Sequence, residues 1–101
     1  MKLENKVAIV TGGGKGIGAD ICLKLAKEGA KIVIAEMDVK SGEDIQKKII
    51  KNKGEAIVVN TNVADEVSVN NMANEAVKKF SKIDILINNA GIRHILSLIH
   101  I

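Results

Sequence analysis

A glycine-rich segment near the start of the chain has the residue types and spacing of a phosphate-binding turn. Glycines at positions 12, 16 and 18 follow an apolar run and precede a segment with apolar residues at helical spacing. Glycine has no Cβ, so these positions permit tight turns and the close approach of a ligand. The first amides of the following helix then present partial positive charge to a pyrophosphate. The predicted anion site consists of Thr11, Gly12, Lys15, Gly16, Ile17 and Gly18.

An acidic residue stands at the end of the next apolar segment. Glu36 directly follows residues 31–35 and comes eighteen positions after Gly18. In dinucleotide-binding folds, a carboxylate about 20 residues after the glycine turn accepts hydrogen bonds from the adenosine ribose. A strand before the turn, a helix after it and an acidic residue downstream favour a dinucleotide site over an ordinary glycine turn.

Apolar periodicity predicts four strands that alternate with three helices. We expect strands at about 6–11, 31–36, 55–61 and 83–88, and helices at about 16–28, 41–53 and 65–81. Nearly continuous apolar strands joined by helices need a parallel sheet that is covered on both faces. Right-handed crossovers predict the strand order 3-2-1-4, which is half of a doubly wound α/β fold. The order reverses between the first and fourth strands, where a ligand would bind.

The third predicted helix is the most regularly patterned. Its apolar residues form one stripe that is typical of a core face. The stripe consists of Val69, Met72, Ala73, Ala76, Val77 and Phe80. Asp65 is expected to cap this helix, and Ser41 is expected to cap the second one.

Composition and charge argue against several other classes of function. Aromatic residues make up 1% of the chain and the net charge of +3 comes from scattered lysines, so we expect no nucleic-acid partner. The apolar runs are too short to cross a membrane and no secretion leader precedes the first strand, so we expect a cytoplasmic protein. Cys22 is the single cysteine and is expected in the core. His94 and His100 have no neighbours at ligand spacing, so no metal site is predicted.

Two motifs at matching distance carry a resemblance to a known family. The first is the spacing Gly-x-x-x-Gly-x-Gly after Thr11, and the second is the run Asn88-Asn89-Ala90-Gly91 after the fourth predicted strand. Together they resemble the short-chain dehydrogenase/reductase family. The resemblance implies a Rossmann-type nucleotide-binding domain, with residues 1–92 as its N-terminal part, and a parent protein that is a homo-oligomer.

The resemblance also implies binding roles at two further strand ends. Asn62 and Val63 match the positions that hold the adenine ring, and an asparagine there is similar to bacterial 3-oxoacyl carrier-protein reductases. Asn89 and Ala90 would lie against the ribose on the nicotinamide side, and the small Ala90 and Gly91 would let the cofactor pass. Without the resemblance, Asn62 is a polar strand end and Gly91 is a turn.

Two charged residues give opposite indications about the cofactor. Glu36 would accept a hydrogen bond from the ribose 2′-hydroxyl of NAD and would repel the 2′-phosphate of NADP. A basic residue at the position of Lys15 accompanies NADP use in similar family members. We expect NAD to be preferred, because Lys15 is long enough to extend into water, and NADP is the alternative.

The resemblance implies hydride transfer between the cofactor and a small alcohol or ketone, or an acyl group on a carrier protein. The family uses a serine and a Tyr-x-x-x-Lys motif for this step. This chain contains no tyrosine, so no catalytic residue is assigned and the 101 residues alone are expected to be inactive. A non-catalytic nucleotide-binding module and a gene fragment without function are the alternatives.

The last part of the chain departs from the family pattern. Family members have about 200–250 residues, so we expect a truncated chain. Truncation would leave Ile85, Leu86 and Ile87 at an open sheet edge and make the fragment marginally stable. Residues 96–101 equal the translation of a transposon mosaic end used in sequencing libraries. We therefore expect residues 93–101 to be a non-native tail, and a natural apolar tail that adds a strand is the competing hypothesis.

Overall fold

Strands and helices alternate along the chain, as the apolar pattern predicts. The computed structural model describes residues 2–89, so Ala90, Gly91 and the predicted tail at 93–101 lie outside the described residues. The elements are β1 (Val7–Thr11), α1 (Gly16–Lys27), β2 (Lys31–Glu36), α2 (Val39–Lys51), β3 (Ala56–Asn60), α3 (Glu66–Phe80) and β4 (Ile85–Asn88). Each predicted boundary is within two residues of the observed one.

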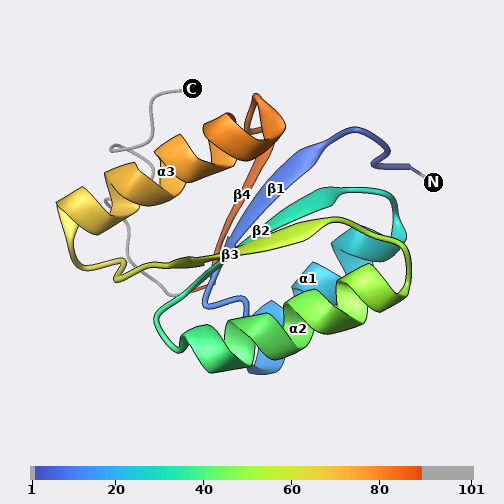
Figure 1. Ribbon diagram of the computed structural model, residues 1–101, viewed down its shortest axis with the longest axis horizontal. Coiled ribbons are helices and arrows are strands. Elements are labelled where there is room, and N and C mark those ends of the chain that lie inside the picture. Colours follow the sequence, from blue (N-terminus) through green and yellow to red (C-terminus); the bar gives the residue numbers. More distant parts are fainter. Residues whose placement is uncertain (1, 90–101) are drawn as a thin grey trace.

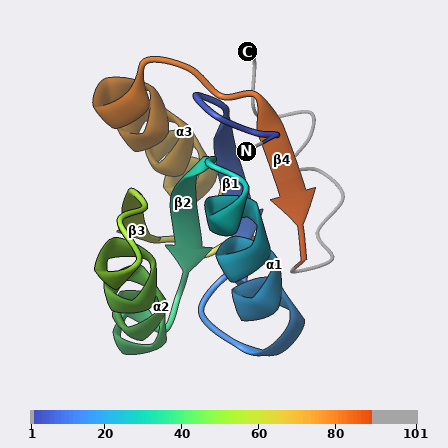
Figure 2. The ribbon, with the colours of Figure 1, turned by 90° about the vertical axis from the view of Figure 1, so that its right-hand side faces the viewer.

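The four strands form one parallel sheet in the order β3-β2-β1-β4 (Figure 1, Figure 2). β1 is central, and its Thr11 pairs with Ala35 of β2 on one side and with Asn88 of β4 on the other. The predicted α/β class and strand order are therefore confirmed. The point at which the strand order reverses lies between β1 and β4, at the carboxyl ends of both strands.

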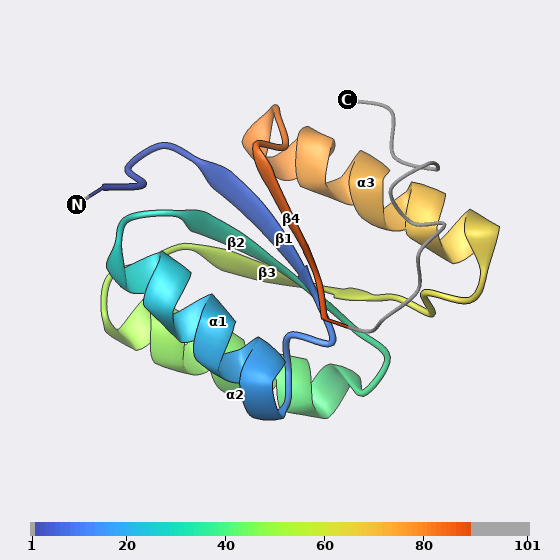
Figure 3. The ribbon, with the colours of Figure 1, turned by 180° about the vertical axis from the view of Figure 1, so that it is seen from behind.

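The central strands contribute to a core on each face of the sheet. Val7 and Ile9 belong to the core beneath α3, whereas Ala8 and Val10 belong to the core beneath α1 and α2. Figure 3 shows α1 and α2 side by side on one face and α3 on the other. Because both faces are buried, β1 is apolar at successive positions and does not alternate with polar residues.

The apolar stripe of α3 is buried in part. Val69, Met72, Ala76 and Phe80 are buried, as predicted. Val77 was also predicted in the core, but it is 48% exposed. A residue eight positions after Val69 lies roughly 80° around the helix from it, and this rotation carries Val77 past the edge of the buried face.

Aspartates cap α2 and α3. Asp65 caps α3 as predicted, and its carboxylate accepts a hydrogen bond from the Val67 amide. The prediction that Ser41 caps α2 is wrong, because the helix begins earlier and Asp38 is its N-cap. The Asp38 carboxylate accepts from the amide and the hydroxyl of Ser41. A carboxylate at this position satisfies helix-start donors and also interacts favourably with the helix dipole.

β4 is the edge strand next to β1. Within residues 2–89 it pairs with β1 alone, as predicted for an edge strand, but its apolar residues are half-buried and not exposed. At the amino end of the strand, Asp84 accepts from the Val7 amide at 2.9 Å and pairs with Lys82 at 3.1 Å. The Val7 hydrogen bond, and then Lys82, lower the pKa of Asp84.

Candidate functional site

The predicted site residues within 2–89 lie at the carboxyl ends of the strands. Thr11 ends β1 and is buried. Its hydroxyl lies 3.4 Å from the Ile87 carbonyl oxygen and 3.3 Å from Asn88 Oδ1, and it donates toward these acceptors. These contacts join the glycine turn to the double-asparagine motif, although 77 positions separate Thr11 from Asn88.

Glycine is required at several positions of the turn. Gly12 and Gly16 have φ angles of +65° and +51°, in the left-handed region that side chains disfavour. A Cβ on Gly18 would collide with the Gly12 carbonyl oxygen and lie 2.8 Å from Asn89 Nδ2. A Cβ on Gly12 would lie 3.3 Å from the same Asn89 atom. The side chain of Asn89 therefore lies against the glycine turn.

Among residues 2–89, no side chain caps the start of α1. Lys15 occupies the N-cap position with an extended backbone, and the first turn contains no acidic residue. The helices α2 and α3 are instead capped by Asp38 and Asp65. The first amides of α1 therefore have no side-chain cap within the described part of the chain, as in helix starts that bind phosphate. Ile17 lies at this helix start and is 71% exposed.

Glu36 lies against the glycine turn. Its Oε1 accepts from the Gly14 amide at 2.9 Å, and its Oε2 accepts from the Asp38 amide at 3.2 Å. Gly14 was not among the predicted site residues. A Cβ at Gly14 would lie 2.9 Å from both Cγ and Oε1 of Glu36, and 2.8 Å from the Gly42 amide nitrogen. The run of three glycines before Lys15 is the sequence signal that could have indicated it.

Lys15 pairs with a carboxylate that sequence reasoning also missed. Its Nζ lies 3.0 Å from Asp38 Oδ2, with side-chain exposures of 66% and 43%. The hydrogen bond to Asp38 and the Asp38 charge raise the pKa of Lys15, and Glu36 acts in the same direction. The hydrogen bond from Lys15 and, to a smaller extent, those from Ser41 lower the pKa of Asp38 to about 2. Both members of the pair are therefore charged at neutral pH, and an aspartate directly before a helix was the available signal.

Asn62 and Val63 follow β3 at the same edge of the sheet. The Thr61 amide donates to the Glu36 carbonyl oxygen at 3.3 Å, which places Asn62 next to the end of β2. The exposed Asn62 accepts from the Ala64 amide through Oδ1 at 3.0 Å, and its own amide donates to Ser68 Oγ at 2.8 Å. Val63 is half-buried against the core beneath α3.

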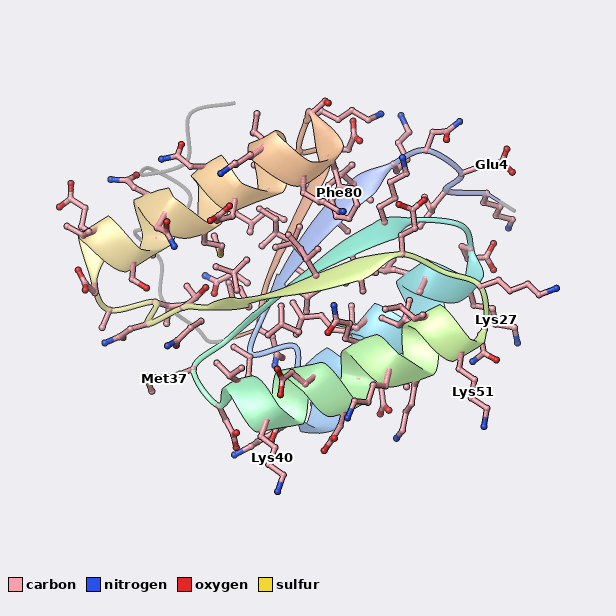
Figure 4. All side chains as sticks on the ribbon, viewed as in Figure 1. Glu4, Lys27, Met37, Lys40, Lys51 and Phe80 are labelled. Atoms are coloured by element: carbon pink, nitrogen blue, oxygen red, sulfur yellow. The ribbon has the colours of Figure 1, made fainter. Side chains whose placement is uncertain are left out.

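A hollow among the described residues lies away from this edge. It has a volume of about 710 Å³ and is lined in part by Lys27, Lys48 and Lys51, near the C-terminal ends of α1 and α2. Figure 4 shows Lys27 and Lys51 at one end of the molecule and Met37 at the other. The hollow is therefore separate from the predicted site.

Three further observations concern residues 2–89. Cys22 is fully buried, as predicted, and burial raises the pKa of its thiol to about 12, so the thiolate is not populated at neutral pH. Within this range, no three or more His, Cys, Asp or Glu side chains group in a way that could hold a metal ion. The helices in the same range are all too short or too polar to cross a bilayer.

Comparison with known proteins identifies the family to which the chain belongs. The family model described as short chain dehydrogenase matches residues 6–100. The chain therefore belongs to the short-chain dehydrogenase/reductase family, as its two motifs predict.

Relatives within this family are similar over most of the chain. An uncharacterized oxidoreductase of Thermotoga maritima is 43% identical over 96 residues, which are 95% of this chain and 38% of that protein. A 3-oxoacyl-[acyl-carrier-protein] reductase of Synechocystis is 43% identical over 91 residues, which are 89% of this chain and 37% of that protein. The chain thus spans less than two fifths of either relative.

Solved structures share the arrangement of strands and helices. A 7α-hydroxysteroid dehydrogenase complexed with NADH and 7-oxo glycochenodeoxycholic acid superposes with a TM-score of 0.83 at 30% identity, over 84% of this chain and 33% of that one. A metagenomic short-chain oxidoreductase in complex with NADP gives a TM-score of 0.85 at 32% identity, over 91% of this chain and 42% of that one. Structures similar to this chain thus include complexes with either nicotinamide cofactor.

Proposed function

We propose that this chain forms the cofactor-binding part of an oxidoreductase that transfers hydride between a nicotinamide dinucleotide and an alcohol or carbonyl group. The observation that carries the proposal is the Glu36 carboxylate, which the Gly14 amide holds at the glycine turn at 2.9 Å. In dinucleotide-binding folds, an acidic side chain at this strand end contacts the adenosine ribose. The NADH and NADP complexes of two similar structures support the same class of cofactor.

The proposal gives each part of the site a role. The start of α1, which no side chain of residues 2–89 caps, binds the pyrophosphate, and the glycine turn lets the backbone approach it. The residues after β3 hold the adenine ring, and those after β4 contact the ribose on the nicotinamide side. When bound, the nicotinamide ring supplies the hydride chemistry. The proposed binding residues are Thr11, Gly12, Lys15, Gly16, Ile17, Gly18, Glu36, Asn62, Val63, Asn89, Ala90 and Gly91.

We propose NAD as the preferred cofactor. Glu36 can accept a hydrogen bond from a 2′-hydroxyl, whereas a 2′-phosphate would add about two negative charges beside this carboxylate. Lys15 is the residue that favours NADP, but its ammonium is paired with Asp38 at 3.0 Å. NADP is the alternative, and the NADP complex of a similar structure supports it.

We propose that the residues that bind the substrate and transfer the proton belong to a part of the whole protein outside this chain. This chain contains no tyrosine for the expected proton transfer. A small alcohol or ketone, or an acyl group on a carrier protein, is the proposed substrate class, and the name of the Synechocystis relative supports the acyl carrier. The proposed parent is a cytoplasmic homo-oligomer.

The test compares the dissociation constants of NAD and NADP for the whole protein by titration calorimetry. We expect NAD to bind more tightly than NADP. The substitution Glu36→Ala should shift the ratio of the two constants toward NADP by about tenfold, equivalent to ~1.4 kcal/mol.

The matched control removes a carboxylate from the other end of the sheet. Glu55 is exposed and directly precedes β3, so Glu55→Ala should leave the ratio unchanged. A ratio that also stays the same in Glu36→Ala would contradict the role of Glu36. If the whole protein bound neither dinucleotide, the proposed function would be wrong.

A further inference from the structure

Lys15 has a carboxylate partner beside Glu36, the residue that we propose contacts the 2′ position of the ribose. Its ammonium lies 3.0 Å from Asp38 Oδ2, and the Asp38 amide donates to Glu36 Oε2 at 3.2 Å. Lys15 therefore contacts Asp38 directly and also interacts electrostatically with Glu36. A phosphate bound beside Glu36 would meet two carboxylates and one ammonium that is already paired.

Asp38 is held in place by contacts other than the one with Lys15. As the N-cap of α2, its carboxylate accepts from the Ser41 amide at 3.3 Å and from the Ser41 hydroxyl at 2.9 Å. The helix dipole stabilises a negative charge at this position. Lys15 is a long side chain on the turn and is 66% exposed. Asp38 is thus the anchored member of the pair, and it determines where the lysine lies.

We infer that Asp38 sets the choice between NAD and NADP by holding Lys15 in an ion pair, which withholds the lysine from a 2′-phosphate. This inference rests on the proposed function. To bind NADP, Lys15 must leave Asp38, and the freed carboxylate then lies close to the phosphate and repels it. A 2′-hydroxyl requires neither change, so NAD binds without disturbing the pair.

The experiment separates the charge of Asp38 from its capping role. Asparagine caps a helix about as well as aspartate does, so Asp38→Asn removes the charge and keeps the cap. Titration calorimetry on the whole protein gives the dissociation constants of NAD, NADP and 2′,5′-ADP. We expect Asp38→Asn to tighten binding of NADP and 2′,5′-ADP by about tenfold and to change NAD binding by less than about twofold.

A double-mutant cycle with Lys15→Gln tests whether Asp38 acts through the lysine. Lys15→Gln alone should weaken NADP binding, because the phosphate would then meet Glu36 and Asp38 without the ammonium. In the Asp38→Asn background, Lys15→Gln should return the affinity for NADP to that of the unmodified protein or below it. If the double variant still bound NADP more tightly than the unmodified protein does, the inference would be overturned, because Asp38 would then act by direct repulsion alone.

A second lysine–aspartate pair provides the matched control. Asp84→Asn breaks the 3.1 Å pair with Lys82 at the opposite end of the sheet, and it should leave the NADP to NAD ratio unchanged. If circular dichroism shows that Asp38→Asn does not fold, Asp38→Ser supplies another good N-cap without the charge. Unchanged NADP binding in a folded Asp38 variant that still binds NAD would overturn the inference and leave the proposed function standing. Failure of the unmodified protein to bind either dinucleotide would overturn both.

Discussion

At the scale of single residues, a glycine amide holds the carboxylate on which the proposed cofactor recognition depends. The bond from Gly14 to Glu36 joins the turn to the end of β2, across 22 positions of sequence. The spacing of an acidic residue after a glycine turn predicted Glu36. Gly14 was missed because its importance comes from the Glu36 side chain, which lies against it only in the folded structure.

Replacing Gly14 with alanine should displace Glu36 from the turn. The added Cβ would lie 2.9 Å from Cγ and Oε1 of Glu36 and 2.8 Å from the Gly42 amide nitrogen, so the carboxylate or the turn must move. We expect NAD affinity to fall by about tenfold and NADP affinity to fall less, because the ribose contact is lost. Titration calorimetry on the whole protein measures both affinities.

The neighbouring glycine offers a control with the same substitution. A Cβ at Gly13 would lie 2.9 Å from Cys22 Sγ and 3.0 Å from the Val10 carbonyl oxygen, in the core and not at Glu36. Gly13→Ala should therefore lower the midpoint of thermal unfolding and leave the ratio of NAD to NADP affinity unchanged. If both alanine variants shifted that ratio equally, contact with Glu36 would not be the cause.

At the scale of elements, the starts of the three helices differ in whether a side chain accepts hydrogen bonds from their first amides. Asp38 and Asp65 occupy the starts of α2 and α3, and a carboxylate that takes these donors leaves less for a ligand phosphate. The start of α1 has no such cap within residues 2–89. The sequence predicted the helices and the Asp65 cap, but it assigned the α2 cap to Ser41 because both Asp38 and Ser41 are good capping residues.

Two valines of α3 should respond very differently to the same substitution. Val69 is fully buried in the core beneath the helix, whereas Val67 is 75% exposed in its first turn. We expect Val69→Ala to lower the free energy of unfolding by about 2 kcal/mol, because apolar contact is lost and a cavity remains. Val67→Ala should change it by less than about 0.5 kcal/mol.

Urea unfolding of the whole protein, followed by circular dichroism, measures this pair of variants. The two substitutions remove the same atoms from the same helix, so helix propensity affects both alike. Equal losses of stability would contradict the orientation of α3 on the sheet.

At the scale of the whole molecule, β4 is a half-buried edge strand of the sheet that the described residues form. Ile85, Leu86 and Ile87 of β4 are covered less completely than the fully buried residues of β1. Unpaired edges of this kind favour association with other chains. The chain also spans less than two fifths of two relatives, so catalysis is a property proposed for the whole protein.

The 101-residue chain by itself should not catalyse the reaction. It contains no tyrosine to exchange a proton with the substrate oxygen. We expect NADH absorbance to stay constant when the purified chain is mixed with NADH and a panel of ketones and 3-oxoacyl thioesters. Circular dichroism on the same sample verifies that the chain is folded. Turnover above the rate without protein would show that the chain holds a complete catalytic site.

The sequence by itself determined the order of elements and the strand order, and it supplied most of the residues of the candidate site as predictions. Apolar periodicity and crossover handedness act over short stretches, so they can be read from the chain. The position of Glu36 followed in the same way, since the length of one strand–turn–helix–strand unit sets its distance from the turn.

Only the tertiary structure decided how the charged groups and the glycines are arranged. The contact of Glu36 with Gly14, the pair of Lys15 with Asp38, and the approach of Asn89 to the turn join different strand ends. Such contacts depend on loop geometry and side-chain rotamers, which periodicity does not encode. The preference between the two cofactors is proposed to depend on these contacts, because they decide which charges meet the ribose.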